Sequence, residues 1–141
     1  MVAHHDRSAL RAFDALEIVE FLIALGQPEP GDNRWAAPIQ AIHSALANLK
    51  PSFPELLASV RFSPNTVEPY SRAVDESISS LGAAGLVSVE NPDFRWLSVK
   101  PGVREAFGEA LDELTPPEMQ AVEELAKHFN AEIGRARRAS A

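Results

Sequence analysis

The sequence predicts a mainly α-helical domain of the α+β class that carries one small β-hairpin. Apolar residues recur at helical spacing along most of the 141-residue chain, which indicates amphipathic helices. Period-two alternation marks two short runs, 86–90 and 95–99, which a turn-forming Asn-Pro-Asp triplet separates. No repeat or second domain is visible, so we expect a single domain over residues 1–141 with flexible ends at 1–7 and 134–141.

The first predicted helix has Ser8 as its N-cap and runs to about Gly26. Its apolar residues cover most of the circumference and leave one narrow charged strip, formed by Asp14, Glu17 and Glu20. A helix that is apolar nearly all round lies in the core or at a subunit interface, so we expect one of these positions for it.

The middle of the chain predicts further helices from the same spacing. One covers residues 34–50, where Pro38 is tolerated because it falls near the first turn. A short helix enters at Pro54, a full helix runs over 70–81, and another follows Gly102. On the 70–81 helix the apolar face is formed by Tyr70, Val74, Ile78 and Leu81, and the outer face by Ser71, Asp75, Glu76 and Ser79.

The last predicted helix opens with a capping box, in which Thr115 and Glu118 stand on either side of the first turn. An apolar seam follows at the spacing of a helix packed along another helix: Met119, Val122, Ala126, Phe129 and Ile133. Because the first helix also has surplus apolar surface, we expect a homodimer joined by the N- and C-terminal helices, with Met119, Val122, Phe129 and Ile133 at its interface. The alternative is that the two terminal helices pair within one chain and close the core of a monomer.

Composition narrows the functional classes. The formal net charge is −7, which argues against tight non-specific binding of nucleic acid, because such binding depends on neutralising phosphates. The chain has no cysteine, so we expect neither disulfides nor a thiolate metal site, and we expect a cytoplasmic location. The N-terminus has no signal-peptide core, and the most apolar run, 18–25, is too short to span a bilayer.

Residues that could carry catalysis or bind a metal are few. His4, His5 and Asp6 are adjacent in the terminus and cannot all face one ion. Glu124 and His128 stand four apart and are expected to form an exposed intrahelical pair, and His43, beside an apolar stripe, is expected to be partly buried with its hydrogen bonds satisfied. No nucleophile, phosphate-loop, dinucleotide or metalloprotease motif occurs. We therefore predict no enzyme activity, no catalytic residue, no metal and no cofactor.

The helix–hairpin–helix unit at 70–114 resembles the second half of a bacterial winged-helix (winged helix-turn-helix) regulator. The stretch LGAAGLVSV, 81–89, is similar to the end of the recognition helix in many of these regulators, and WLSVKPGVREAF, 96–107, to the second wing strand and the start of the next helix. The PYS stretch at 69–71 is weakly similar to domains of the Panacea antitoxin type. The resemblance covers residues 62–114 and implies a winged-helix-like domain with a two-stranded wing and extra terminal helices.

In such a fold the helix before the hairpin is the one that enters the DNA major groove. Base reading needs Arg, Lys, Asn or Gln on that helix, but its outer face offers Arg72 against Asp75 and Glu76. We therefore favour a regulatory or protein-interaction module, either antitoxin-like or inhibitory. Its partner, a protein, is expected to contact Arg72, Asp75, Glu76, Ser79, Phe94, Arg95 and Trp96.

The alternative is a dimeric DNA-binding transcription regulator. Its contacts would come from Ser71, Arg72, Arg95, Lys100, Arg135, Arg137 and Arg138. The three arginines near the C-terminus are the only basic cluster, and we expect them to serve the helix dipole and solubility first. On the hairpin, alternation places Phe94 and Trp96 on one face, so at least one of them is expected to pack on the helices while Arg95 faces solvent.

Overall fold

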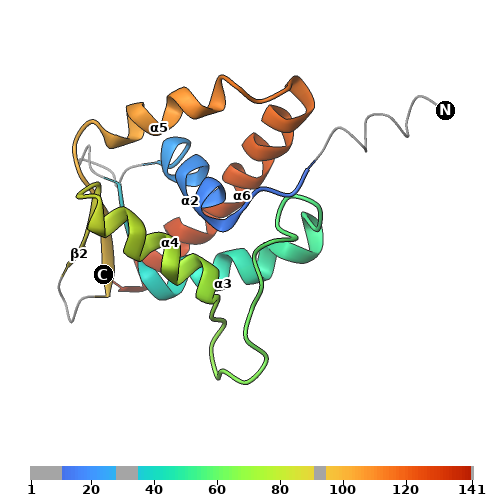
Figure 1. The fold of residues 1–141 in the computed structure, drawn as a ribbon. Helices are drawn as coiled ribbons and strands as arrows, with labels where there is room; N and C mark the ends of the chain where they lie inside the picture. Colours follow the sequence, from blue (N-terminus) through green and yellow to red (C-terminus); the bar gives the residue numbers. More distant parts are fainter. Residues whose placement is uncertain (1–10, 28–34, 91–94, 141) are drawn as a thin grey trace.

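The computed structural model describes residues 11–27, 35–90 and 95–140, which form a mainly helical fold with a small antiparallel sheet (Figure 1). In chain order the elements are α2 (Ala15–Ala24), β1 (Ala36–Pro38), α3 (Ile39–Leu49), the 3-10 turn η1 (Lys50–Ser52), α4 (Arg72–Ala83), β2 (Val87–Glu90), β3 (Trp96–Val99), α5 (Val103–Leu111) and α6 (Pro116–Ser140). Within the described ranges this gives five α-helices and three strands, so the predicted α+β class is confirmed. No helix among those residues is both long and apolar enough to cross a membrane.

The sheet confirms the predicted hairpin and adds a strand to it. β2 and β3 pair antiparallel, with Val87 opposite Val99, and β1 pairs with the other edge of β3, which gives the order β1-β3-β2. The predicted helix over 34–50 therefore begins too early, since its first residues form β1. Pro38 is the physical reason, because a proline keeps the residue before it out of the α region. Pro38 itself is extended and serves as the N-cap of α3.

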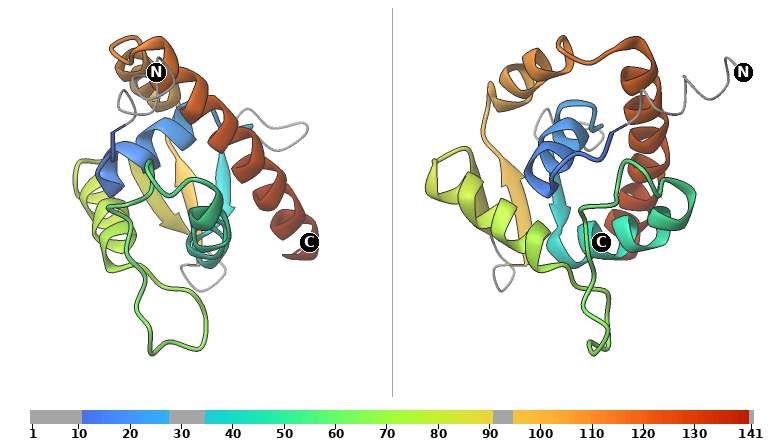
Figure 2. Two further views of the ribbon diagram at one scale, coloured as in Figure 1. Left: turned by 90° about the vertical axis from the view of Figure 1, so that its right-hand side faces the viewer. Right: turned by 45° about the vertical axis from the view of Figure 1, so that its right-hand side comes forward.

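α2 lies at the centre of the fold, as its apolar circumference predicts, and it packs against α4, α5 and α6. α4 and α6 lie on opposite sides of α2 and the sheet (Figure 2, left). The helix starts at Ala15 rather than just after Ser8, because Asp14 and Glu17 form a capping box in which the Asp14 carboxylate accepts from the Glu17 N–H at 2.8 Å. Ser8 lies outside the described residues.

Between α3 and α4 the chain makes turns instead of the short helix expected at Pro54. Leu57 and Val60 are nevertheless completely buried there. The Lys50 ammonium group donates to the carbonyl of Val60 at 2.7 Å and fixes the turns against the end of α3. Burial of these two side chains thus holds the segment in place without a helix.

α6 begins with the predicted capping box. The Thr115 N–H donates to Glu118 Oε1 at 2.9 Å, and the Glu118 N–H donates to Thr115 Oγ1 at 3.3 Å. Arg11 reaches the other Glu118 oxygen at 3.3 Å. The bond from the Thr115 backbone is the main reason that the pKa of Glu118 lies below its ordinary value. α6 then continues to Ser140, so residues 134–140 are helical, and the flexibility predicted for 134–141 stays a prediction.

Replacing Thr115 with alanine is expected to lower the free energy of unfolding by about 1 kcal/mol, because the N–H of Glu118 loses its acceptor. Urea denaturation of the two chains measures the difference. Thr66→Ala is the control, since Thr66 is exposed in a loop and its hydroxyl makes only a 3.4 Å bond to the Ser63 carbonyl. Equal stability of all three chains would contradict this role of the capping box.

The apolar seam of α6 is used inside the chain. Val122, Phe129 and Ile133 are at most 1% exposed, Met119 is half-buried against the core, and α6 packs on α3 and α2. The dimer interface predicted from these residues is therefore wrong, because their side chains already fill the core of one chain. The N- and C-terminal helices pack against each other within one chain, which is the alternative to the dimer stated in the sequence analysis.

Candidate functional site

Four predicted partner-binding residues share one exposed face of α4, which we call the α4 face: Arg72, Asp75, Glu76 and Ser79. Arg95 is exposed at the start of β3, as predicted, and Trp96 beside it is half-buried. Phe94 lies outside the described residues, so the expectation about that ring pair stays a prediction. Ser71, predicted on the outer face and as a nucleic-acid contact, has no exposed surface, and this prediction is wrong because Ser71 is the N-cap of α4.

A buried histidine fixes the start of α4. The Ser71 N–H donates to Nδ1 of His43 at 3.0 Å, and the Ser71 hydroxyl accepts from the Val74 N–H at 3.3 Å. His43 comes from α3, is 2% exposed, and stacks on the Tyr70 ring with centroids 5.2 Å apart. The Tyr70 hydroxyl donates to Asp75 at 3.2 Å. The α4 face is thus tied to the core. His43 is more deeply buried than the partial burial that the sequence predicts, and its Nδ1 has the expected hydrogen bond.

Folding stability is expected to fall as the pH drops through the range below about 6.5, because of His43. Burial lowers the pKa of His43 from its ordinary value, and nearby Asp75 opposes this only in part. As the pH falls, His43 therefore becomes protonated in the unfolded chain before it does in the folded chain. The contribution of His43 to stability is complete above its pKa in the unfolded chain, and it is lost progressively as the pH falls to its pKa in the folded chain. Urea denaturation at pH 5 to 7.5 measures the loss.

In that experiment His43→Gln should remove most of the pH dependence, since an amide oxygen accepts from Ser71 without titrating. His128→Gln is the matched control, because His128 is exposed on α6 and should leave the dependence intact. Identical pH profiles for the wild-type chain and His43→Gln would contradict the assignment.

The end of α4 sets the direction of the hairpin. Gly85 has φ +79°, a conformation that favours glycine, and the N–H of Leu86 donates to the Leu81 carbonyl at 3.0 Å. Together with the bond from the Gly85 N–H to the Gly82 carbonyl, this is the Schellman arrangement that stops a helix. Only one residue then separates Gly85 from β2, so the hairpin lies close to α4.

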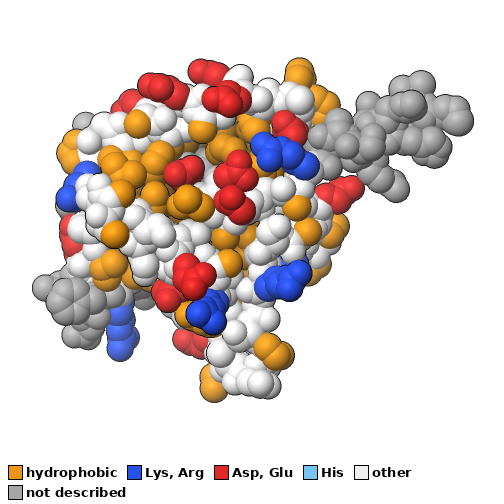
Figure 3. Space-filling model, viewed as in Figure 1, with side chains coloured by type: hydrophobic (Ala, Val, Ile, Leu, Met, Phe, Trp, Pro, Cys, Tyr) orange, Lys and Arg blue, Asp and Glu red, His pale blue; other side chains and the backbone are white. Residues whose placement is uncertain are grey.

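The charge of the α4 face does not suit base reading. Arg72 forms an ion pair with Glu76 at 3.1 Å, so the only cation on this face is already matched by a carboxylate. Asp75 adds a further negative charge. Figure 3 shows more carboxylates than cations on the side of the molecule that α2 and α5 share with α4. The exposed acids of α5 and of the turn that follows it are Glu105, Glu109, Asp112 and Glu113.

The charged strip of α2 adds to this acidic side. Asp14 is exposed, and Glu17 and Glu20 are half-buried, so the three acids of the predicted strip all reach the surface. Burial raises the pKa of Glu20, and the neighbouring charges of Asp14 and Glu17 raise it further. A basic partner would relieve this repulsion, whereas a phosphate backbone would increase it.

A loop for which the sequence predicts no role lies beside the α4 face. Residues 61–70 protrude at the start of α4, at the end of the molecule to which the hairpin also points (Figures 1 and 2). The Ser63 N–H donates to the Tyr70 carbonyl at 2.9 Å, and Gln40 donates to the Pro69 carbonyl at 2.8 Å, so the base of the loop is held. Val67 is fully exposed within it. The signal available in the sequence was Val67 itself, an apolar side chain between the polar residues Thr66 and Glu68.

The predicted nucleic-acid contacts do not form one surface. Arg72 is on α4, and Arg95 and Lys100 flank β3. Arg135 and Arg138 are instead on α6, which lies on the other side of the sheet from α4 (Figure 2, left). Arg137 is not a free contact either, since it donates to the carbonyls of Ala36 and Gln27 at 2.8 and 2.9 Å. Its predicted role in binding nucleic acid is wrong for that reason.

Arg137 belongs to a set of side chains that satisfy the carbonyls at the end of α2. Asn130 donates to the Leu25 carbonyl at 3.0 Å, and Arg104 donates to the carbonyls of Ile23 and Gly26. α2 has no basic residue in its own last turn, so α5 and α6 supply the hydrogen bonds and the positive charge that a helix C-terminus needs.

Groups with metal-binding chemistry do not gather in the part of the chain that the structure describes, where no cluster of three or more His, Cys, Asp or Glu occurs. Glu124 and His128 form the predicted exposed intrahelical pair, 3.5 Å apart. His4, His5 and Asp6 lie outside the described residues.

Comparisons with protein-family models, with curated proteins and with solved structures find no match to this chain. The assignment of a function therefore depends on the surfaces described above.

Proposed function

We propose that this chain is a non-enzymatic regulatory or protein-interaction module built on a winged-helix fold, and that the α4 face binds a protein. The order of the elements supports a winged-helix fold. A helix (α2), a strand (β1), two helices (α3 and α4) and two strands (β2 and β3) follow one another before α5. The sheet order β1-β3-β2 supports it further, since the hairpin then forms the wing beside α4. A fold of this kind does not dictate its ligand, so the surface decides.

The observation that carries the proposal is the charge of the α4 face. Its single arginine is paired with Glu76, and Asp75 is held by Tyr70 next to it. In a major groove these carboxylates would approach phosphates of the same sign, and neither can donate a hydrogen bond to guanine N7 or O6. Against a basic protein surface the same charges are complementary and favour fast, specific association.

The exposed loop and hairpin give the partner surface its apolar part. Val67 is fully exposed in the loop before α4, and Trp96 is half-buried at the start of β3. Apolar and aromatic anchors inside a charged rim are the usual composition of a protein interface. An antitoxin-like or inhibitory role would use such a face to cover a basic site on the partner.

The second candidate is a DNA-binding regulator, and the position of α4 immediately before the hairpin favours it. In that arrangement α4 would be the recognition helix, with Arg95 at the wing. The carboxylates on α4 make it the weaker candidate.

Reversing two acids, Asp75→Lys with Glu76→Lys, is expected to abolish capture of the specific partner from an extract of the source cells. Both side chains are exposed, so the fold should survive, and charge complementarity is lost. The matched control, Glu109→Lys with Glu113→Lys, makes the same change in charge on exposed residues of α5 and the turn that follows it. Quantitative mass spectrometry of the retained proteins measures the difference.

The proposal expects a protein that the wild type and the α5 control retain and the α4 variant loses. Retention of the same proteins by all three chains would contradict it.

A further inference from the structure

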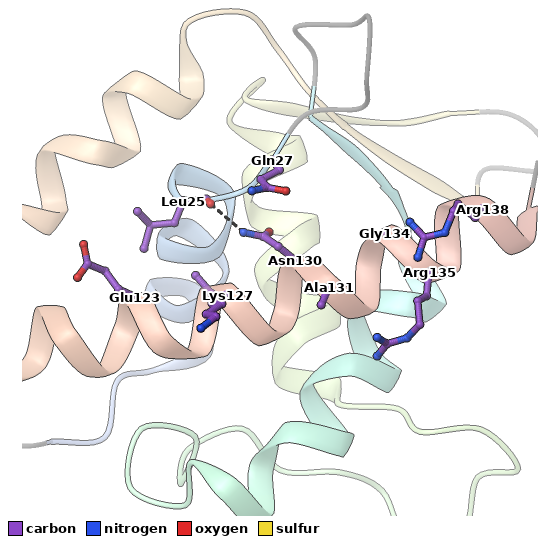
Figure 4. Close-up of a pocket in the computed structure, with 10 residues that line it drawn as sticks. Leu25, Gln27, Glu123, Lys127, Asn130, Ala131, Gly134, Arg135 and Arg138 are labelled. Atoms are coloured by element: carbon purple, nitrogen blue, oxygen red, sulfur yellow. Dashed lines mark hydrogen bonds between the residues drawn. The ribbon is translucent and has the colours of Figure 1, made fainter.

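α6 lies on the side of the molecule opposite α4 (Figure 2). An open groove of about 560 Å³ runs there between the end of α2 and the outer face of α6 (Figure 4). We call it the α6 groove. Three cations of α6 line it, Lys127, Arg135 and Arg138, together with the amide side chains of Gln27 and Asn130. None of these cations belongs to the α4 face, so the groove is a separate surface.

The cations of the groove are available to a ligand. Lys127, Arg135 and Arg138 are exposed and have no ion-pair partner among the residues that the structure describes. Among the residues that the structure describes, one carboxylate, Glu123, lines the groove with them. Other acids of α6 are held elsewhere: Glu118 in the capping box, Glu124 by His128 and Glu132 by Asn48. A positive groove in a chain of net charge −7 is a local feature that the overall composition hides.

The helix dipole does not account for this arrangement. Its effect is limited to the last turn, which includes Arg138, whereas Lys127 lies in the middle of α6. From Lys127 to Arg135 the helix rises about 12 Å, so the charges are spread along a line instead of meeting at one point. In Figure 4 the side chains of Arg135 and Arg138 point to different sides of the helix. The spacing suits an extended polyanion better than a single small anion.

The lining also distinguishes between polyanions. Its described residues, within 11–27, 35–90 and 95–140, include no aromatic side chain on which a base could stack. Such stacking is a main source of affinity for single-stranded nucleic acid. The lining does contain amides, because Gln27 is exposed and Asn130 keeps its side-chain oxygen as an acceptor after donating to the Leu25 carbonyl. Side-chain amides such as these can form hydrogen bonds with the N–H and C=O groups of a peptide backbone. Leu25 and Ala131 add apolar contact.

We propose that the α6 groove binds an extended acidic segment of a protein, with its carboxylates on Lys127, Arg135 and Arg138 and its backbone on the amides of Gln27 and Asn130. Charge complementarity selects this occupant, and the amide and apolar lining favours a peptide over a nucleic acid.

The test uses the full chain and a labelled peptide of ten glutamates, followed by fluorescence anisotropy and by ¹⁵N–¹H chemical shifts. Saturable binding is expected, with shifted amides confined to the end of α2 and to the outer face of α6. Lys127→Glu with Arg135→Glu should raise the Kd about ten-fold or more. The matched control is Arg61→Glu with Lys100→Glu, which makes the same change in charge at exposed residues outside the groove and should change the Kd less than about two-fold, because screening limits distant charges.

Three results would overturn the proposal. Equal weakening by both double variants would mean that only the overall charge matters. Amide shifts outside the groove, or no saturable shift in the wild type, would show that the groove is not the binding site. This measurement on the wild type remains valid even if a variant does not fold. Tighter binding of a ten-nucleotide oligothymidylate than of the peptide would assign the groove to nucleic acid.

Discussion

Replacing Phe129 with aspartate is expected to unfold the chain at room temperature. Phe129 is 1% exposed and fills the core on the inner side of α6. Removing a buried phenylalanine side chain costs about 3–5 kcal/mol, and placing a carboxylate there adds a desolvation penalty. The total is comparable to the whole stability of a typical domain, about 5–15 kcal/mol. Circular dichroism and urea denaturation measure the loss.

The same variant distinguishes the two roles considered for the α6 seam. If Phe129 lay at a dimer interface, the Phe129→Asp variant would be a folded monomer, and light scattering would give half the mass of the wild-type dimer. The structure predicts loss of helical signal instead. Gln120→Asp is the control, since Gln120 is exposed on the same helix and should leave both fold and mass unchanged.

Replacing Gly26 with alanine is expected to destabilise the fold by about 1–3 kcal/mol, through overpacking. A Cβ atom at Gly26 would stand 2.1 Å from the Trp35 indole nitrogen and 3.0 Å from the Leu22 carbonyl oxygen. Trp35 is 1% exposed and cannot swing into solvent, so the end of α2 or the start of β1 has to shift. Thermal denaturation measures the change.

Gly108→Ala is the matched control for that prediction. Gly108 lies inside α5, and a Cβ atom there would meet nothing within 4 Å. Alanine is the better helix former, so this change should stabilise the chain by up to about 1 kcal/mol. Two substitutions of the same chemistry are therefore expected to have opposite signs. Stabilisation by Gly26→Ala would show that Trp35 does not pack as described.

Features that the sequence could predict depend on neighbouring residues. The Thr115–Glu118 capping box and the hairpin around 86–99 are local patterns, and both are present in the structure. The apolar circumference of α2 also predicted its central place, because only the core accepts such a helix.

Features that were missed depend on contacts between distant segments. β1 has only three residues and exists because β3 pairs with it, although Pro38 already argued against a helix at Ala37. Arg137 looked like a free cation, but α2 ends where its guanidinium can reach the Gln27 carbonyl. The α6 groove likewise needs the end of α2 beside α6, a proximity that neither segment encodes alone.

If the α4 face binds a protein and not DNA, as proposed, selection from a pool of random DNA duplexes at physiological salt is the sharpest test. We expect this chain to enrich no DNA sequence. Enrichment of one sequence that binds with a Kd of about 10⁻⁸ M or below, and that Arg72→Ala and Arg95→Ala each weaken, would contradict the proposal.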